Sequence, residues 1–226
     1  MSTNTTSVWR KKLKELEIVV VIPTYNNGKT LAAVIEEVCR YADDIIVVND
    51  GSTDDTANIL EQYPAIRTIT HPVNKGKGTA LKHGLSQAKK EGFRYAITID
   101  SDGQHFASDI PCFIEAIEKE PDTLLVGARN LASDNMPGKN TFANKFSNFW
   151  FRLETGLKLE DTQSGYRLYP LRKMNVQSCW YTAKYEFELE AIVFAAWGDV
   201  VVKNIPIHVY YPCLLYTSPS PRDAHE

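Results

Sequence analysis

Runs of β-branched residues alternate with amphipathic helical patterns through the first half of this chain. The first run, residues 18–22, is continuously apolar, which is typical of a strand buried on both faces of a parallel sheet. Leu31, Val34 and Val38 follow at helical spacing, which predicts an amphipathic helix over about 29–41. Parallel strands need such a crossover between them. The alternation therefore predicts an α/β fold.

The same alternation continues as far as residue 126. Helical patterns lie between the apolar runs, and we predict the later strands over 45–48, 66–70, 95–99 and 124–126. A regular alternation of strands and helices is typical of a parallel sheet built with right-handed crossovers. The predicted fold class is an open, mostly parallel sheet with helices on both faces.

The second half of the chain is less regular. We predict helices over about 142–153 and 186–197, with a turn region at 161–169 between them. A last strand, interrupted at Pro206, follows the second of these helices. That helix begins with three alternating acidic residues, Glu186, Glu188 and Glu190. We favour a solvated helix start over the alternative, in which one of them faces the sugar.

Composition limits the class of protein and its partners. The chain has 226 residues, of which 43% are hydrophobic and 23% charged, as in one globular domain. Its formal net charge of -3 gives no overall field to attract nucleic acid, so we exclude that partner. The four cysteines contain no CxxC pair, and we expect reduced thiols in a cytoplasmic protein. No apolar run approaches the roughly 20 residues of a membrane-spanning helix.

We divide the chain into three parts. Residues 1–17 are polar and basic, and we favour a solvated helix there over peripheral contact with an anionic membrane surface. Residues 18–212 form the predicted α/β domain. Residues 213–226 lack periodicity and resemble the translated read-through of a cloning adapter, so we expect a tail that is not native to the protein.

Two acidic residues stand at the edge where a parallel sheet binds ligands. Asp100 and Asp102 follow a buried strand and are two residues apart in an extended segment, so their carboxylates point the same way. Such oxygens suit Mg²⁺ or Mn²⁺, which keep positions open for phosphate oxygens. We favour a metal site over the alternative, in which Asp100 caps a turn and Asp102 is solvated.

Other nucleotide-binding signatures are absent or incomplete. The turn after the first predicted strand is not GxGxxG, which makes a dinucleotide site of the Rossmann type a poor explanation. The segment GKGT at 76–79 matches a P-loop only in part, because its lysine is followed by glycine. Its glycines still let backbone amides approach an anion.

Five motifs in register carry a resemblance to a known family. They are VIPTYN at 21–26, VNDGSTDDT at 48–56, NKGKGTA at 74–80, DSDGQH at 100–105 and DTQSGYR at 161–167. Together they resemble the family 2 glycosyltransferases of the GT-A fold, and among these the dolichyl- or polyprenyl-phosphate mannose synthase branch. The likeness runs from about residue 18 to residue 211.

The resemblance implies roles for residues at matching positions. For a nucleotide-sugar donor linked to UDP or GDP it implies Pro23, Thr24, Tyr25, Asn27, Asp50, Lys77, Asp100, Ser101 and Arg129. For Mg²⁺ or Mn²⁺ it implies Asp100, Asp102 and Gln104. For the acceptor or its phosphate it implies Arg129, Lys139 and Arg167. The chain departs from the pattern at Asn27, where the family often has Glu, and at Lys139 and Lys145, where the branch tends to have arginines.

The resemblance also implies an inverting sugar transfer, with Asp102 and Asp161 as catalytic residues. A nucleoside diphosphate leaves with developing negative charge, which a cation at the paired carboxylates stabilises. A hydroxyl acceptor, such as a saccharide, would need Asp161 as base, whereas a lipid phosphate would not. Asp161 would then orient Arg167 or a sugar hydroxyl. The alternative functions are a catalytically silent nucleotide-sugar-binding module and a nucleotidyltransferase.

Overall fold

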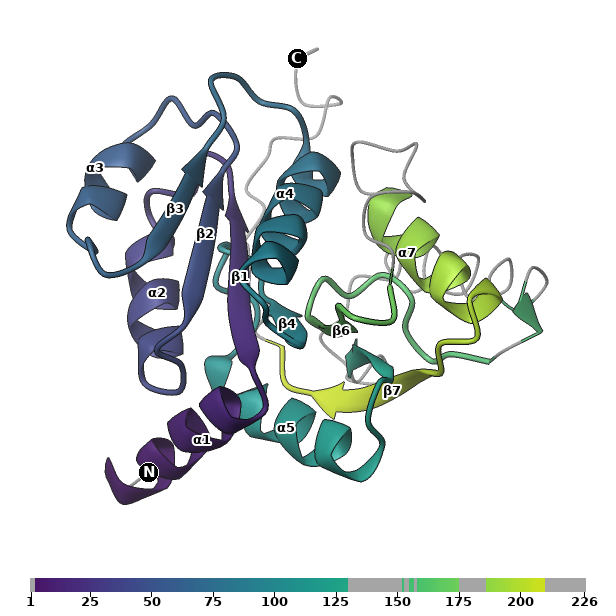
Figure 1. The fold of residues 1–226 in the computed structure, drawn as a ribbon. Coiled ribbons are helices and arrows are strands. Elements are labelled where there is room, and N and C mark those ends of the chain that lie inside the picture. The colour runs from purple at the N-terminus through teal and green to yellow at the C-terminus, as the bar shows by residue number, and fades with distance from the viewer. Residues whose placement is uncertain (1–2, 130–151, 153–154, 157, 175–185, 210–226) are drawn as a thin grey trace, which may run out of the picture.

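The structure is a computed structural model, and it describes residues 3–129, 152, 155–156, 158–174 and 186–209. Within these residues seven strands form one sheet, in the order β3-β2-β1-β4-β6-β5-β7 (Figure 1). The strands are β1 (Ile18–Thr24), β2 (Ile45–Asn49), β3 (Arg67–Thr70), β4 (Tyr95–Thr98), β5 (Leu124–Arg129), β6 (Arg167–Pro170) and β7 (Val202–Ile207). β6 runs antiparallel to its neighbours β4 and β5, whereas the other described pairs are parallel.

Helices cover both faces of the sheet. The described helices are α1 (Thr3–Glu15), α2 (Leu31–Cys39), α3 (Thr56–Glu61), α4 (Lys77–Lys90), the 3₁₀ turn η1 (Ala107–Asp109), α5 (Ile110–Lys119) and α7 (Glu186–Trp197). Successive residues of β1 point to opposite faces, as the pleat requires. Val20 and Ile22 join a core with α1, α2, α3 and α5, and Val19 and Val21 join another with α4 and α7. The predicted open sheet with two covered faces is confirmed.

The main correction concerns the predicted turn region at 161–169. Its last residues instead belong to β6, which is buried throughout and pairs Thr98 with Arg167 and Tyr95 with Pro170. Only four residues long and beginning with an arginine, this strand has no local apolar pattern. Its burial comes from a partner about 70 residues away in the sequence, which local periodicity cannot register.

The last strand also differs from its prediction, because β7 continues through Pro206 without interruption. Pro206 is exposed and lies opposite Ala128 of β5. β7 is the edge of the described sheet, and a proline at an edge removes no hydrogen bond to a further strand. An isolated bridge between Val209 and His105 then brings the chain back to the loop after β4.

The basic residues near the N-terminus are paired with acids of the domain. Arg10 lies 3.1 Å from Asp43, and Lys12 lies 2.6 Å from Glu118 of α5. Leu13 of the same helix is buried in the core. The predicted helix is thus confirmed. Among the described helices, none has both the length and the apolar character needed to cross a bilayer.

Several predictions fall outside the described residues. These are the helix over 142–153, the lysines at 139 and 145, and the separate tail at 213–226.

The close approach of α4 to the sheet gives a stability prediction. A Cβ added to Gly84 would lie 2.5 Å from Val21 Cγ1 and 3.1 Å from Val48 Cγ2, closer than packed atoms allow. We expect Gly84→Ala to lower the free energy of unfolding in urea by about 1–3 kcal/mol. The gain in helix propensity, about 1 kcal/mol, opposes this loss only in part.

A double-mutant cycle isolates the contact. Val21→Ala removes the nearest methyl group, so the double variant should lose less stability than the sum of the two single losses. A Gly84→Ala protein as stable as the wild type would contradict the packing described.

Candidate active site

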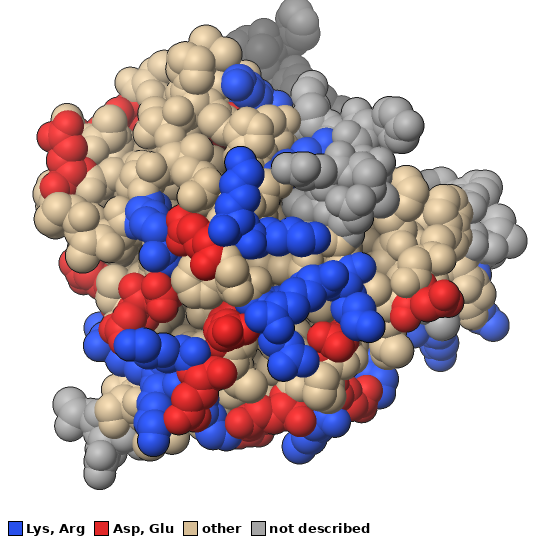
Figure 2. Space-filling view, viewed as in Figure 1, with Lys and Arg blue, Asp and Glu red and all other residues tan. Residues whose placement is uncertain are grey.

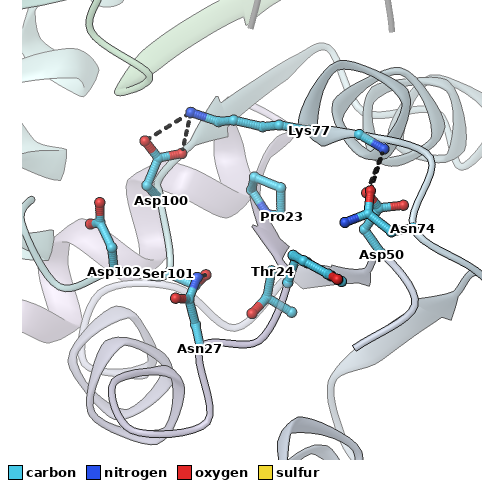
Figure 3. A pocket seen from close by; sticks show the side chains of 11 residues that line it. Pro23, Thr24, Asn27, Asp50, Asn74, Lys77, Asp100, Ser101 and Asp102 are labelled. Atoms are coloured by element: carbon cyan, nitrogen blue, oxygen red, sulfur yellow. Dashed lines mark hydrogen bonds and ion pairs between the residues drawn. The ribbon is translucent and has the colours of Figure 1, made fainter. Parts of the chain in front are cut away.

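A cavity of about 670 Å³ lies at the carboxyl edge of the sheet, by the ends of β1, β2 and β4 and the start of α4 (Figure 3). Its lining residues are Pro23, Thr24, Tyr25, Asn27, Asp50, Asn74, Gly76, Lys77, Asp100, Ser101 and Asp102. The lining includes every residue predicted to bind the nucleotide-sugar except Arg129. Arg129 ends β5, and its side chain lies outside what the structure describes.

Asp50 fixes the loop that forms one wall of this cavity. It follows β2, and its backbone N–H donates to the carbonyl of Thr24 at 2.9 Å, which joins the ends of two neighbouring strands. The carboxylate accepts hydrogen bonds from the backbone amides of Lys75, at 2.9 Å, and Gly76, at 2.8 Å. Gly76 has a φ of 94°, a left-handed conformation that favours glycine. Asp50 therefore holds the entry into α4 in place.

Two histidines form a hydrogen-bonded chain with Asp50. Nδ1 of His71 lies 2.6 Å from Asp50 Oδ1, and because a carboxylate can only accept, this nitrogen is the donor. Nε2 of His71 lies 2.7 Å from Nδ1 of His83. Partial burial, with the nearby His71 and Lys75, lowers the pKa of His83. The sequence indicated no partner for either histidine, because the three residues come from separate elements.

Lys77 sits between two carboxylates from different parts of the fold. Its ammonium lies 2.8 Å from Oδ1 and 2.9 Å from Oδ2 of Asp100 (Figure 3). It also lies 3.2 Å from Oε1 of Glu188 in α7. Burial alone would lower the pKa of Lys77, but the two carboxylates outweigh it and raise that pKa. Burial likewise opposes ionisation of Asp100, yet Lys77 holds the pKa of Asp100 below its ordinary value. Both pKa shifts favour the charged forms of Lys77 and Asp100 at neutral pH.

The ion pair of Glu188 with Lys77 was not predicted from the sequence. We expected a solvated helix start, but the Glu188 side chain is only 8% exposed and pairs with Lys77. Periodicity gives little guidance here, because the whole of α7 is apolar apart from its glutamates. The signal available in the sequence was an acidic residue among the apolar residues of this helix, because acidic residues are rarely buried without a partner.

The first turn and the loop of the paired aspartates are tied together. The Asn27 amide donates to Ser101 Oγ at 2.7 Å, and the Thr30 hydroxyl donates to the Ser101 carbonyl at 2.6 Å. Asn27, which replaces the Glu common in the family, thus has a structural partner in this chain. These bonds set the position of Asp102, whose side chain is exposed at the cavity.

Arg167 is not among the residues that line this cavity, and its expected role toward an acceptor or phosphate stays a prediction. It is fully buried, and its guanidinium donates to the carbonyls of Ser164 at 2.7 Å, Thr162 at 2.9 Å and Glu188. A Cβ on Gly165, in the loop that it holds, would lie within 2.8 Å of Asp100, Lys77 and Glu188. Arg167 is therefore a positioning residue for the ion cluster.

Asp161, the predicted base, is also not among the residues that line the cavity. It is fully buried, and its Oδ1 accepts a hydrogen bond from the Gln163 amide at 2.9 Å. Asn204 of β7 donates to the Asp161 carbonyl at 3.0 Å, which fixes the turn to the sheet. The Asp161 carboxylate thus takes part in the turn, and Asp161 is not among the lining residues.

The paired aspartates offer two of the ligands that a divalent cation would need. Asp100 and Asp102 line the same cavity and offer the hard oxygen ligands that Mg²⁺ and Mn²⁺ take. Asp102 Oδ1 accepts the Gln104 backbone amide at 2.9 Å, while Gln104 itself is not among the lining residues. In the described part of the chain no three His, Cys, Asp or Glu side chains gather as a metal site. The donor set thus fits a cation that also takes ligands from phosphate and water.

The sequence matches the family model named Glycosyl transferase family 2 over residues 19–178. The chain belongs to glycosyl transferase family 2. It is 31% identical over 215 residues to the UDP-N-acetylglucosamine–dolichyl-phosphate N-acetylglucosaminyltransferase of Methanococcus voltae, covering 86% of each chain. It is 28% identical over 160 residues to the polyprenol monophosphomannose synthase of Mycolicibacterium smegmatis, covering 66% of this chain and 60% of the relative.

The fold agrees with this assignment. The glucosyl-3-phosphoglycerate synthase of Mycobacterium tuberculosis, solved with Mn²⁺, UDP and glucosyl-3-phosphoglycerate, superimposes with a TM-score of 0.67 at 20% identity. The match covers 92% of this chain and 77% of that one. The predicted resemblance and the GT-A fold are therefore confirmed, and the protein is a glycosyltransferase.

The buried position of Arg167 gives a prediction that separates its two roles. Arg167→Met would leave carbonyls without donors in the core, at about 1–3 kcal/mol for each unsatisfied group. We expect a large loss in the free energy of unfolding, measured in urea. Arg172→Met is the matched control, because Arg172 is exposed in a surface ion pair with Glu17. Its loss should lower the free energy of unfolding by only about 0–1 kcal/mol. A stable Arg167→Met protein that has lost only acceptor binding would contradict the positioning role.

Proposed function

We propose that this family 2 enzyme transfers a sugar from a nucleoside diphosphate donor to a polyprenyl or dolichyl phosphate, with inversion at the anomeric carbon. The observation that carries the proposal is the cavity lined jointly by Asp50, Lys77, Asp100 and Asp102. The named relatives act on dolichyl phosphate or polyprenol, which supports this class of acceptor over a saccharide.

The donor would lie across the ends of β1, β2 and β4. Asp50 and Tyr25 line the part of the cavity near the ends of β1 and β2, where a base and ribose would bind. Lys77 and the aspartates line the part near β4, where a diphosphate would meet a cationic group. UDP in a related solved structure favours a uridine donor over a guanosine one.

Asp100 and Asp102 would hold Mg²⁺ or Mn²⁺ together with the diphosphate. A bound cation of this kind supplies Lewis-acid stabilisation of the charge that develops on the leaving nucleoside diphosphate. Lys77 adds positive charge beside the same group. Asp102, with its exposed carboxylate, is the residue whose loss should affect the metal most directly.

The placement of Asp161 favours a phosphate acceptor. A hydroxyl acceptor needs a base that can reach its proton, and the buried Asp161 does not line the cavity. A lipid phosphate is already anionic and attacks without such a base. Because polyprenyl phosphates are membrane lipids, we further propose that the enzyme works at the cytoplasmic surface of a membrane, in peripheral contact with it.

The proposed reaction can be tested with the full chain. The protein is incubated with Mn²⁺ and UDP-N-acetylglucosamine, UDP-glucose or GDP-mannose, with and without polyprenyl phosphate. We expect release of nucleoside diphosphate that depends on the lipid phosphate, and a lipid-linked sugar of inverted anomeric configuration by NMR. Transfer to a free saccharide with none to the lipid would overturn the assignment of the acceptor.

Asp102→Asn tests the metal within the same assay. We expect a loss of turnover of about 100-fold or more, because the leaving charge loses its stabilisation. Thermal unfolding should change little, since the side chain is exposed. Asp43→Asn, an exposed aspartate on the far side near α1, is the control. Full activity of Asp102→Asn in the presence of EDTA would refute metal dependence.

A further inference from the structure

The ion cluster of Lys77, Asp100 and Glu188 raises a question about how Asp100 becomes available to a divalent cation. Lys77 contacts both oxygens of Asp100, at 2.8 and 2.9 Å. A cation bound directly to Asp100 would approach to about 2.0–2.2 Å of the same oxygens. The two positive groups would repel each other at such close range in a partly buried site. Lys77 and the cation therefore compete for one carboxylate.

Glu188 limits how far Lys77 can move. The Glu188 side chain is nearly buried, and its backbone carbonyl accepts a hydrogen bond from Arg167, which holds the start of α7 in place. If Lys77 left the cluster altogether, Glu188 would remain as a buried charge without a counter-ion, which is costly. A smaller motion keeps the contact with Glu188 and gives up only the contact with Asp100.

The direction of that motion follows from the packing. The backbone at Gly165 closes one side of the cluster, with no room for even a Cβ beside the three charged groups. On the other side the Lys77 side chain is 20% exposed and lines the cavity. A turn of the ammonium away from Asp100 therefore leads into the space where the donor's diphosphate is proposed to lie.

We propose that Lys77 is the resident counter-cation of Asp100, and that it moves to the diphosphate when the donor binds, with Glu188 as its anchor. Lys77 then weakens cation binding to the nucleotide-free enzyme and strengthens nucleotide binding to the cation-loaded one. Metal and nucleotide binding become coupled, because each favours the same position of Lys77. The inference rests on the proposed donor, and it adds a positioning and coupling role for Lys77 and Glu188.

The test measures binding rather than turnover. Mn²⁺ affinity is determined by the EPR signal of free Mn²⁺, first without nucleotide and then with UDP, for the wild type and Lys77→Met. Without nucleotide, Lys77→Met should bind Mn²⁺ at least fivefold more tightly. At saturating Mn²⁺ it should bind UDP at least tenfold more weakly. The coupling between the two ligands therefore falls in the variant.

Two further variants separate competition from general charge effects. Lys75→Met removes a positive charge from the same loop, and its exposed side chain makes no ion pair with Asp100, so its Mn²⁺ affinity should stay within twofold of wild type. Lys77→Arg keeps a cation in the cluster and should retain the weak Mn²⁺ binding of the wild type. If Lys77→Met does not fold, the double variant Lys77→Met/Glu188→Gln is measured in its place, because it also removes the carboxylate that would be left without a counter-ion.

The outcomes distinguish this inference from the proposed function. Unchanged or weaker Mn²⁺ binding by Lys77→Met, without nucleotide, overturns the competition and makes the pair with Asp100 a permanent one. Failure of the wild type to bind UDP in the presence of Mn²⁺ contradicts the proposed donor instead. Tighter Mn²⁺ binding that equals the effect of Lys75→Met would reflect net charge alone and would also overturn the inference.

Discussion

The ion cluster around the partly buried ammonium of Lys77 is the interaction on which the site depends. It joins the start of α4, the end of β4 and the first turn of α7, three segments that are distant in the sequence. Lys77 holds the pKa of Asp100 below its ordinary value, and the two carboxylates raise the pKa of Lys77. Arg167 fixes the loop that closes this cluster on one side (Figure 3 shows the cavity side). Pairing within the cluster thus offsets the free-energy cost of placing charged groups in a partly buried site at the carboxyl edge of the sheet.

The sheet positions the loops that carry these charged residues. Parallel pairing of β1 with β2 and with β4 brings three loops to one edge, so that Asp50, Asn27 and Asp100 share one cavity. The face of the molecule seen in Figure 2 carries acidic and basic side chains side by side, in keeping with its many surface ion pairs.

Much of this arrangement could be predicted from the sequence. The buried strands and amphipathic helices up to β5 have strong local periodicity, and the rule that ligands bind at the carboxyl edge located Asp50 and the paired aspartates. Partnerships across the fold could not be predicted. The roles of Glu188, His71 and Arg167 depend on which side chains meet them, and β6 exists only because β4 pairs with it. Local sequence contains no record of such contacts.

The central claim is that a nucleoside diphosphate binds in the cavity at the ends of β1, β2 and β4. Hydrogen–deuterium exchange of the full chain, with and without UDP and Mn²⁺, tests it directly. Protection should appear in the segments 23–28, 50–52, 74–78 and 100–104, whose residues line or support the cavity. Unchanged exchange in these segments, with protection elsewhere or none at all, would contradict the account.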